Sequence, residues 1–393
     1  MDWVEDLISK SQVKLFPTLH PHTLDAVNRY VASRRAKGVN EKTILRDLYT
    51  LRLFSDAFGK RDYAKATRED LEAALTKLEQ GGKSESTKEK VRVTIKSFYK
   101  YAMGKDLFYP EQVAWIKSVR RKMRHLPDLL EEEDIATLLG ATKNLRDKAI
   151  IALLFDSGIR AGELINMKAK DVDLAKEPAH IIVDGKTGMR QVPIMFSVPY
   201  LADYLNAERR KPGEHLFTQE GVWKDKNMPI DNHALGTMLR KVAKRAGIGK
   251  HVHPHLFRHS RATYYANRLT EQQLKVFFGW VGDSKMASTY VHLSGRDIDN
   301  AILRANGFKT QEVKMAPKLV AKICAKCKAS NTMEAIYCTR CGAPLDISTA
   351  MKMQEAEVKV NDALLESIKD PKIIEEIVHA YLMQQKEKSR ARG

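Results

Sequence analysis

The chain has 393 residues, of which 43% are hydrophobic, so it is long enough for two large domains and a small module. Its 67 lysines and arginines against 49 acidic residues leave a formal charge of +18, which favours a polyanionic partner, nucleic acid first. It contains no run of about 18 apolar residues, which argues against a membrane protein. We see no secretion signal at the start, and therefore expect a cytoplasmic protein associated with the nucleoid.

Residues 1–104 predict a helical domain. Apolar residues recur at helical spacing in four stripes, which begin at Leu24, Ile44, Leu71 and Val91. Thr67, with Asp70 three residues later, predicts the N-terminal cap of the third helix. We interpret the stripes as core. The opposite faces carry a basic set typical either of solvated surface or of a grip on a duplex backbone: Lys88, Lys90, Arg92, Lys96 and Lys100.

Residues 105–127 are predicted to connect this domain to the next. They contain a proline and a run of basic residues, which are Lys117, Arg120, Arg121, Lys122 and Arg124. Such a run is often only solvated surface. A linker that crosses a DNA backbone would need the same composition.

Residues 128–309 predict a larger, mainly helical domain with a small hairpin. In the hairpin, two apolar, β-rich runs surround a Gly-Lys-Thr-Gly turn, in HIIVDGKTGMRQVPI. The expected fold class is therefore mainly α, with a helical N-terminal domain followed by a mixed α+β domain.

Four stretches of the larger domain carry residues suited to phosphoryl transfer. Arg160 and Glu163 lie in FDSGIRAGEL, Lys186 in the hairpin turn, His255 and Arg258 in HPHLFRHSRAT, and Trp280 and Tyr290 in FFGW and STYVH. Singly, each is an ordinary residue, and a lone tyrosine is more often structural. Together they offer guanidiniums for an anionic phosphodiester, a proton acceptor for a tyrosine hydroxyl and a lysine to protonate the departing oxygen.

In this order the stretches resemble the motifs of the tyrosine recombinases, or phage-type integrases: Gly-(Leu/Ile)-Arg-x-x-Glu-Leu, a hairpin lysine, His-x-x-Arg-His, Gly-(His/Trp) and a final tyrosine. The resemblance covers about residues 20–305, since the helical unit is also similar to the family's SAM-like core-binding domain. It implies the following roles: Tyr290 as nucleophile, Arg160 and Arg258 as phosphate clamp, His255 as proton acceptor, Lys186 as general acid, Trp280 as hydrogen-bond donor to phosphate, and Glu163 as orienting residue. Trp280 stands where histidine is more usual.

The resemblance implies a site-specific recombinase that cuts and rejoins double-stranded DNA through a 3′-phosphotyrosyl bond. Four protomers on a synapse are expected, and neither metal nor ATP for catalysis. We favour integration of a virus or mobile element over chromosome-dimer resolution, because the chain continues beyond the two-domain plan. A nicking-closing topoisomerase and a catalytically silent DNA-binding regulator are the alternatives. A metal-dependent nuclease built on His251, His253, His255 and His259 lacks an accompanying carboxylate set.

Residues 320–346 predict a structural zinc site. Cys324 and Cys327 form one Cys-x-x-Cys knuckle, and Cys338 and Cys341 form a second after ten intervening residues. The segment is too short to fold on a core alone and resembles a zinc ribbon. Lys322, Lys326, Lys328 and Arg340 make DNA contact one possible task, and protein docking is another.

Residues 347–393 predict a helical tail. Its apolar stripe runs from Ile373 to Leu382 and must be buried on its own chain or on a neighbouring protomer.

Overall fold

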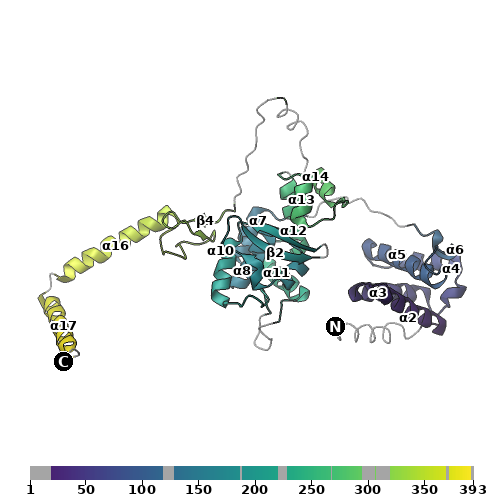
Figure 1. The fold of residues 1–393 in the computed structure, drawn as a ribbon, viewed down its shortest axis with the longest axis horizontal. Helices are drawn as coiled ribbons and strands as arrows, with labels where there is room; N and C mark the ends of the chain where they lie inside the picture. The colour runs from purple at the N-terminus through teal and green to yellow at the C-terminus, as the bar shows by residue number, and fades with distance from the viewer. Residues whose placement is uncertain are drawn as a thin grey trace. The chain divides into compact units, whose positions relative to one another are not determined.

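The computed structural model describes residues 19–117, 128–185, 188–219, 228–266, 268–293, 306, 319–368 and 371–390. The chain divides into two units, Met1–Arg124 and His125–Gly393, and each is described by itself (Figure 1). None of the described helices is both long and apolar enough to cross a membrane.

The N-terminal unit is helical, as the apolar stripes predicted. Its elements are α2 (Pro21–Ala36), α3 (Glu41–Phe58), the short η1 (Tyr63–Lys65), α4 (Arg68–Gln80), α5 (Glu85–Ala102) and α6 (Glu111–Ala114). One apolar cluster joins the inward faces of these helices, with Ile44, Leu71 and Ile95 almost completely buried. Thr67 and Asp70 form the predicted capping box at the start of α4.

Part of the basic face of this unit is directed inward rather than to solvent. Lys88 is 9% exposed and donates to the Glu79 carbonyl oxygen at 2.7 Å. Arg92 forms an ion pair with the Glu79 carboxylate. Lys96 donates to the Ile116 carbonyl oxygen at 2.8 Å. The expectation of a solvated or DNA-gripping side chain was therefore wrong for Lys88, because its buried ammonium on α5 bonds to Glu79 on the neighbouring helix α4.

The C-terminal unit is built around α8, whose residues from Ala149 to Ser157 are buried on all sides. The elements are α7 (Glu132–Gly140), α8 (Leu145–Ser157), α9 (Ala161–Asn166), η2 (Ala169–Asp171), β1 (Val172–Asp173), β2 (Ala179–Gly185), β3 (Gly188–Ile194), α10 (Val198–Glu208), α11 (Asn232–Arg245), α12 (Pro254–Ala266), α13 (Glu271–Phe278) and α14 (Met286–Leu293). Helices α7, α10 and α12 and strand β3 pack against α8. The predicted hairpin is present as antiparallel β2 and β3, with β1 as a third strand.

The cysteine segment packs on this unit and leads into two helices. Strands β4 (Lys322–Ile323) and β5 (Ser330–Asn331) pair antiparallel. The Tyr200 hydroxyl of α10 donates to the Glu334 carboxylate at 2.9 Å, and Leu319 joins the apolar core of the C-terminal unit. Helices α16 (Ile347–Ile368) and α17 (Pro371–Arg390) follow. The predicted tail stripe lies on α17, where the described apolar side chains are mostly exposed.

Candidate active site

Arg160 and Glu163 are fixed where α8 turns into α9. Helix α8 ends at Ser157, and Gly158 adopts the left-handed conformation that reverses the chain. Arg160 is the N-cap of α9, and the Glu163 carboxylate accepts from the Arg160 backbone N–H at 2.9 Å and from its Nη1 at 2.8 Å. The Arg160 side chain is 29% exposed and that of Glu163 is 2% exposed. The buried carboxylate therefore fixes the position of the Arg160 side chain and leaves part of its guanidinium accessible to solvent.

Arg190 on β3 is a second cationic partner of Glu163. Its Nη1 and Nη2 donate to the two oxygens of Glu163, each at 2.9 Å. Burial disfavours the charged form of Glu163, but the hydrogen bonds from Arg190 and Arg160 outweigh it and lower the pKa of the carboxyl to about 2. Glu163 is therefore an anion at neutral pH.

The C-terminal end of α13 collects three arginines. Its last carbonyl groups lack helical donors and carry the negative end of the helix dipole. Arg190 Nε donates to the Phe277 carbonyl oxygen at 3.1 Å, Arg258 Nη2 to that of Phe278 at 2.7 Å, and Arg160 Nη2 to that of Gly279 at 3.3 Å. Three consecutive carbonyl groups thus hold three guanidiniums, which lie far apart in the sequence, in one cluster.

Arg258 is the most buried of these cations, at 6% exposure. Its Nη1 also donates to the Gly158 carbonyl oxygen at 3.0 Å. Burial, followed by repulsion from Arg160, lowers the pKa of Arg258 to about 9, so the side chain is cationic at neutral pH.

Tyr290 lies on α14 between an imidazole and an indole. His259 Nδ1 and the Tyr290 hydroxyl form a hydrogen bond. The Trp280 ring is stacked on the Tyr290 ring, with centroids 5.5 Å apart and planes inclined by 2°. Burial raises the pKa of Tyr290, and Arg258 partly opposes this. The hydroxyl is therefore protonated at neutral pH and is 1% exposed with the rest of its residue.

Both histidines of the His-x-x-Arg-His stretch lie on α12. Burial and then His255 lower the pKa of His259, while burial and then Arg258 lower the pKa of His255. Both rings are therefore mainly neutral at pH 7, and a neutral imidazole has one nitrogen that can accept a hydrogen bond. Within the described part of the chain, the hydroxyl of Tyr290 is bonded to His259 and not to His255.

Two groups of predicted functional residues lie outside the described residues. One is Lys186, the predicted general acid, which lies between β2 and β3 in the sequence. The other is most of the basic linker run, from Arg120 to Arg124.

The sequence motifs did not single out Arg190, and they gave His259 no direct contact with Tyr290. A signal for Arg190 was available, because β-strand alternation puts it on the same face as Val192 and Ile194, which are buried. An arginine on an inward face needs a carboxylate partner. For His259, only the fold brings α12 and α14 together, so the sequence held no comparable signal.

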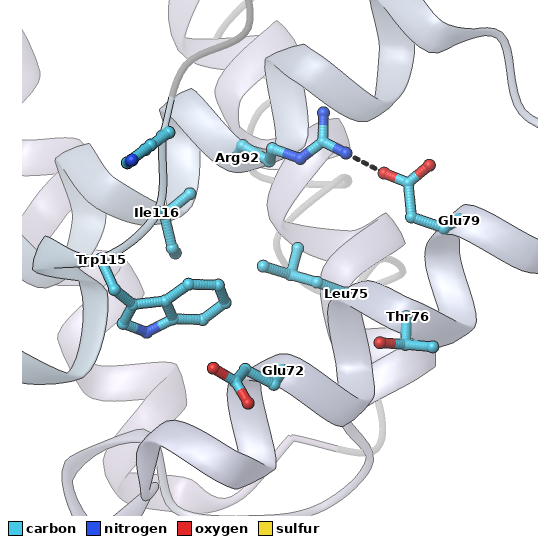
Figure 2. A pocket seen from close by; sticks show the side chains of 8 residues that line it. Glu72, Leu75, Thr76, Glu79, Arg92, Trp115 and Ile116 are labelled. Carbon is cyan, nitrogen blue, oxygen red and sulfur yellow. Dashed lines mark hydrogen bonds and ion pairs between the residues drawn. The ribbon is translucent and has the colours of Figure 1, made fainter.

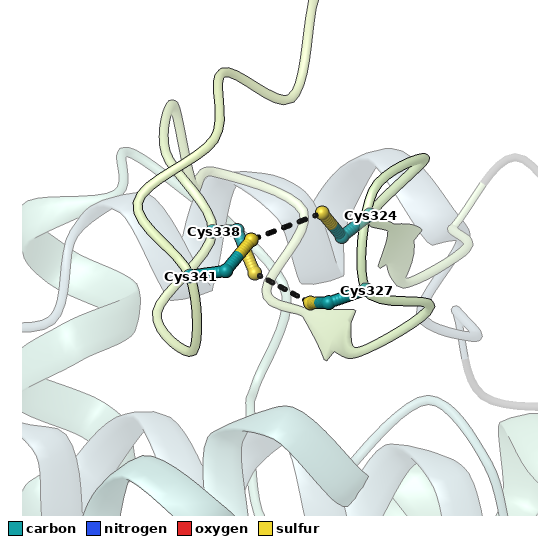
Figure 3. Close-up of side chains that lie close together, drawn as sticks. All are labelled: Cys324, Cys327, Cys338 and Cys341. Atoms are coloured by element: carbon teal, nitrogen blue, oxygen red, sulfur yellow. Dashed lines mark hydrogen bonds between the residues drawn. The ribbon is translucent and has the colours of Figure 1, made fainter.

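The four cysteines converge on one point (Figure 3). The Sγ atoms of Cys324 and Cys341 are 3.6 Å apart, as are those of Cys327 and Cys338, and all four lie within 4.8 Å of one another. Four sulfurs at about 2.3 Å from one zinc ion are about 3.8 Å apart in a tetrahedron, so the donor set fits zinc. Among the described residues this is the only such cluster, and the histidines of α12 do not form one.

A hollow of about 320 Å³ lies in the N-terminal unit between α4, α5 and the residues after α6 (Figure 2). Its wall contains the Arg92–Glu79 ion pair, Glu72 and the Trp115 ring. It mixes charged and apolar groups, and none of the metal-binding sets found among the described residues lies in its wall, so we assign it no chemistry.

Residues 128–296 match the phage integrase family, and residues 49–106 match the N-terminal SAM-like domain of phage integrases. A tyrosine recombinase of Thermosipho africanus is 29% identical over 60% of this chain and 83% of its own length. Tyrosine recombinase XerC of Lactobacillus delbrueckii is 27% identical, covering 66% of this chain and 91% of the relative, and XerA of Pyrococcus horikoshii is 25% identical, covering 73% and 95%.

Solved structures share the fold. A lambda integrase dimer bound to a COC′ core site has a TM-score of 0.56 at 17% identity, covering 74% of this chain and 80% of that chain. XerH bound to a difH substrate in a post-cleavage complex has a TM-score of 0.54 at 19% identity, covering 70% and 82%. Neither family match extends beyond residue 296, so the cysteine segment and the tail lie outside both.

Proposed function

We propose that the chain is a member of the phage integrase family, whose models match residues 49–106 and 128–296, and that it exchanges DNA strands at a specific site through a covalent bond between Tyr290 and DNA. The observation that carries the proposal is the Tyr290 hydroxyl bonded to a neutral imidazole, beside a cluster of arginines held by the end of α13. This arrangement joins a nucleophile, a proton acceptor and cations for phosphate oxygens.

In the proposed reaction the Tyr290 oxygen attacks the scissile phosphorus and its proton passes to His259. A bond forms between the tyrosine oxygen and phosphorus, while the bond from phosphorus to the 5′ oxygen breaks. Arg160 and Arg258 balance the charge that develops on the non-bridging oxygens. Lys186 delivers the proton that makes the 5′ hydroxyl. The phosphodiester energy is kept in the 3′-phosphotyrosyl bond, so a 5′ hydroxyl of another duplex reverses the step.

Access to the nucleophile requires a movement. Tyr290 is 1% exposed and stacked on Trp280, so a phosphate reaches its hydroxyl only after α14 shifts or the loop of residues 279–285, which carries Trp280, shifts. We infer that binding of DNA drives this shift, since only the DNA-bound state gains from it.

The test is trapping of the covalent intermediate. Binding sites are first selected from random duplexes, and a nicked suicide duplex built on the selected site is incubated with the protein in EDTA. We expect a denaturation-resistant protein–DNA adduct from the wild type and none from Tyr290→Phe. Site-specific binding without an adduct from the wild type would instead identify a DNA-binding regulator. Relaxation of a supercoiled plasmid that lacks the selected site would indicate a topoisomerase.

For the biological role we propose integration or excision of a virus or mobile element, since residues 297–393 exceed both family matches. A synapse of four protomers on two duplexes is part of this proposal. Recombination between the selected site and a different partner site on a second molecule supports integration. Exchange confined to two copies of one site within one circle supports dimer resolution.

We propose further that Cys324, Cys327, Cys338 and Cys341 hold one structural zinc ion. All four positions of a tetrahedron are then filled by thiolates, so the ion offers no place for substrate.

A further inference from the structure

We propose that Arg190 is a positioning residue of the strand-transfer reaction, which sets the Arg160 guanidinium through Glu163. This inference rests on the proposed function. Arg190 is 10% exposed, and each of its three guanidinium nitrogens donates a hydrogen bond within the protein. Two of them bind the Glu163 carboxylate and the third binds the Phe277 carbonyl oxygen, and both acceptors belong to groups that hold other parts of the site.

The geometry of the Glu163 carboxylate carries the first step. Each of its oxygens accepts one donor from Arg190, at 2.9 Å, and one donor from Arg160, at 2.8 or 2.9 Å. The forked pair with Arg190 fixes the plane of the carboxylate, which a single hydrogen bond would not do. Arg160 Nη1 donates to the same carboxylate. The direction in which the Arg160 guanidinium points therefore depends on the carboxylate plane that Arg190 fixes.

Two glycines show that the backbone is shaped to admit this ion network. A Cβ atom on Gly185, the last residue of β2, would lie 2.5 Å from Glu163 Oε1. A Cβ atom on Gly279, which has a φ of +59°, would lie 2.8 Å from Arg190 Nη1. The hairpin and the end of α13 thus approach the charged groups as closely as glycine allows.

The third contact of Arg190 ties the network to the end of α13. Arg190 Nε holds the Phe277 carbonyl, two residues before Gly279, whose carbonyl accepts from Arg160. Arg160 therefore bonds to two groups that Arg190 holds in place, the Glu163 carboxylate and the end of α13. Loss of Arg190 should leave the Arg160 charge in place but misdirect it.

The experiment measures single-turnover cleavage by Arg190→Gln at saturating DNA, on two suicide duplexes. One has a normal scissile phosphate. The other has a methylphosphonate there, whose methyl group replaces a non-bridging oxygen and removes the charge that Arg160 balances. We expect a cleavage rate about 10²-fold below wild type on the phosphate and less than about 10-fold below wild type on the methylphosphonate, with unchanged DNA affinity.

A second measurement and a matched control complete the test. In an Arg160→Gln background, Arg190→Gln should slow cleavage by less than about twofold, because the two residues act in series. Arg146→Gln also breaks a buried arginine–carboxylate pair, with Asp147, and should lower stability without this substrate dependence. Arg190→Lys, which keeps the charge but loses the fork, serves if Arg190→Gln does not fold.

Equal slowing on both duplexes, multiplicative slowing with Arg160→Gln, or no slowing would each overturn the role of Arg190. These outcomes require that the wild type cleaves both duplexes. Absence of any wild-type adduct would instead refute the proposed function.

Discussion

The hydrogen bond between Tyr290 and His259 should make cleavage depend on the charge of one imidazole. Burial lowers the pKa of His259 below the ordinary histidine value of about 6.5, so the ring is neutral at pH 7 and can accept the tyrosine proton. It loses this ability only when it becomes protonated, at a pH below about 6.5. We expect the single-turnover rate to be flat near pH 7 and to fall as the pH drops below that value. In His259→Gln the rate should be about 10²- to 10⁴-fold lower, without this acid limb.

His255→Gln is the matched control for this prediction. The two rings lie on the same helix, and both have lowered pKa values. If His259 is the proton acceptor, His255→Gln keeps the acid limb. Loss of the limb in His255→Gln, with His259→Gln unaffected, would make His255 the acceptor, as the resemblance alone suggested.

Residues differ in how far the sequence predicts their surroundings. The order of Arg160, Arg258, Trp280 and Tyr290 in recognisable stretches singled them out, although their roles stay predictions until tested. The hydrogen-bond partner of Tyr290 was not predictable, because two histidines one helical turn apart offer the same chemistry. The choice between them depends on the packing of α12 against α14, which is a tertiary contact.

Among the helices and strands too, the sequence predicts some elements and not others. The stripes of the N-terminal helices and the β2–β3 hairpin were predicted because each element has one solvated face and a clear period. Helix α8 has no such stripe, since residues from Ala149 to Ser157 are buried on every side. The docking of the cysteine segment through Tyr200 and Glu334 joins residues 134 positions apart and had no local signal.

That docking should make the proposed zinc site matter for the stability of residues 128–296, the family-matched segment that we call the catalytic unit. Met333 packs on its core, and Glu334 accepts from Tyr200 at 2.9 Å and lies 3.7 Å from Lys148 Nζ. We expect Cys324→Ser with Cys338→Ser to lose the zinc, measured by atomic absorption. The segment should then unfold, and the free energy of unfolding of the catalytic unit should fall by about 1–3 kcal/mol, measured in urea.

Glu334→Gln separates docking from metal binding. This variant should keep one zinc ion per chain and lose about 1 kcal/mol, because only the contacts with Tyr200 and Lys148 are weakened. A cysteine variant without zinc whose catalytic unit is as stable as wild type would show that the segment does not support that unit.

At the scale of the whole molecule, the positive charge is distributed unevenly along the chain. Residues 347–393 contain eight basic and eight acidic residues, so the net charge of +18 resides in residues 1–346. Helices α16 and α17 expose apolar side chains instead, among them Leu365, Tyr381 and Leu382. A segment with this surface adds little to the attraction of phosphates.

We therefore expect removal of residues 347–393 to leave the salt dependence of DNA binding unchanged. The logarithm of the binding constant falls with the logarithm of salt concentration by about 0.9 per neutralised phosphate, so the slope counts phosphate contacts. Titrations of a selected duplex between about 50 and 200 mM salt should give slopes that agree within about one unit for the full and shortened chains. Replacing Arg120, Arg121, Lys122 and Arg124 by glutamine is the positive control, because a linker that crosses the backbone contributes up to four such contacts. A shallower slope for the shortened chain, with no change for the linker variant, would show that the tail binds DNA despite its balanced charge. The basic residues of the tail must then face the duplex while its acidic residues face away.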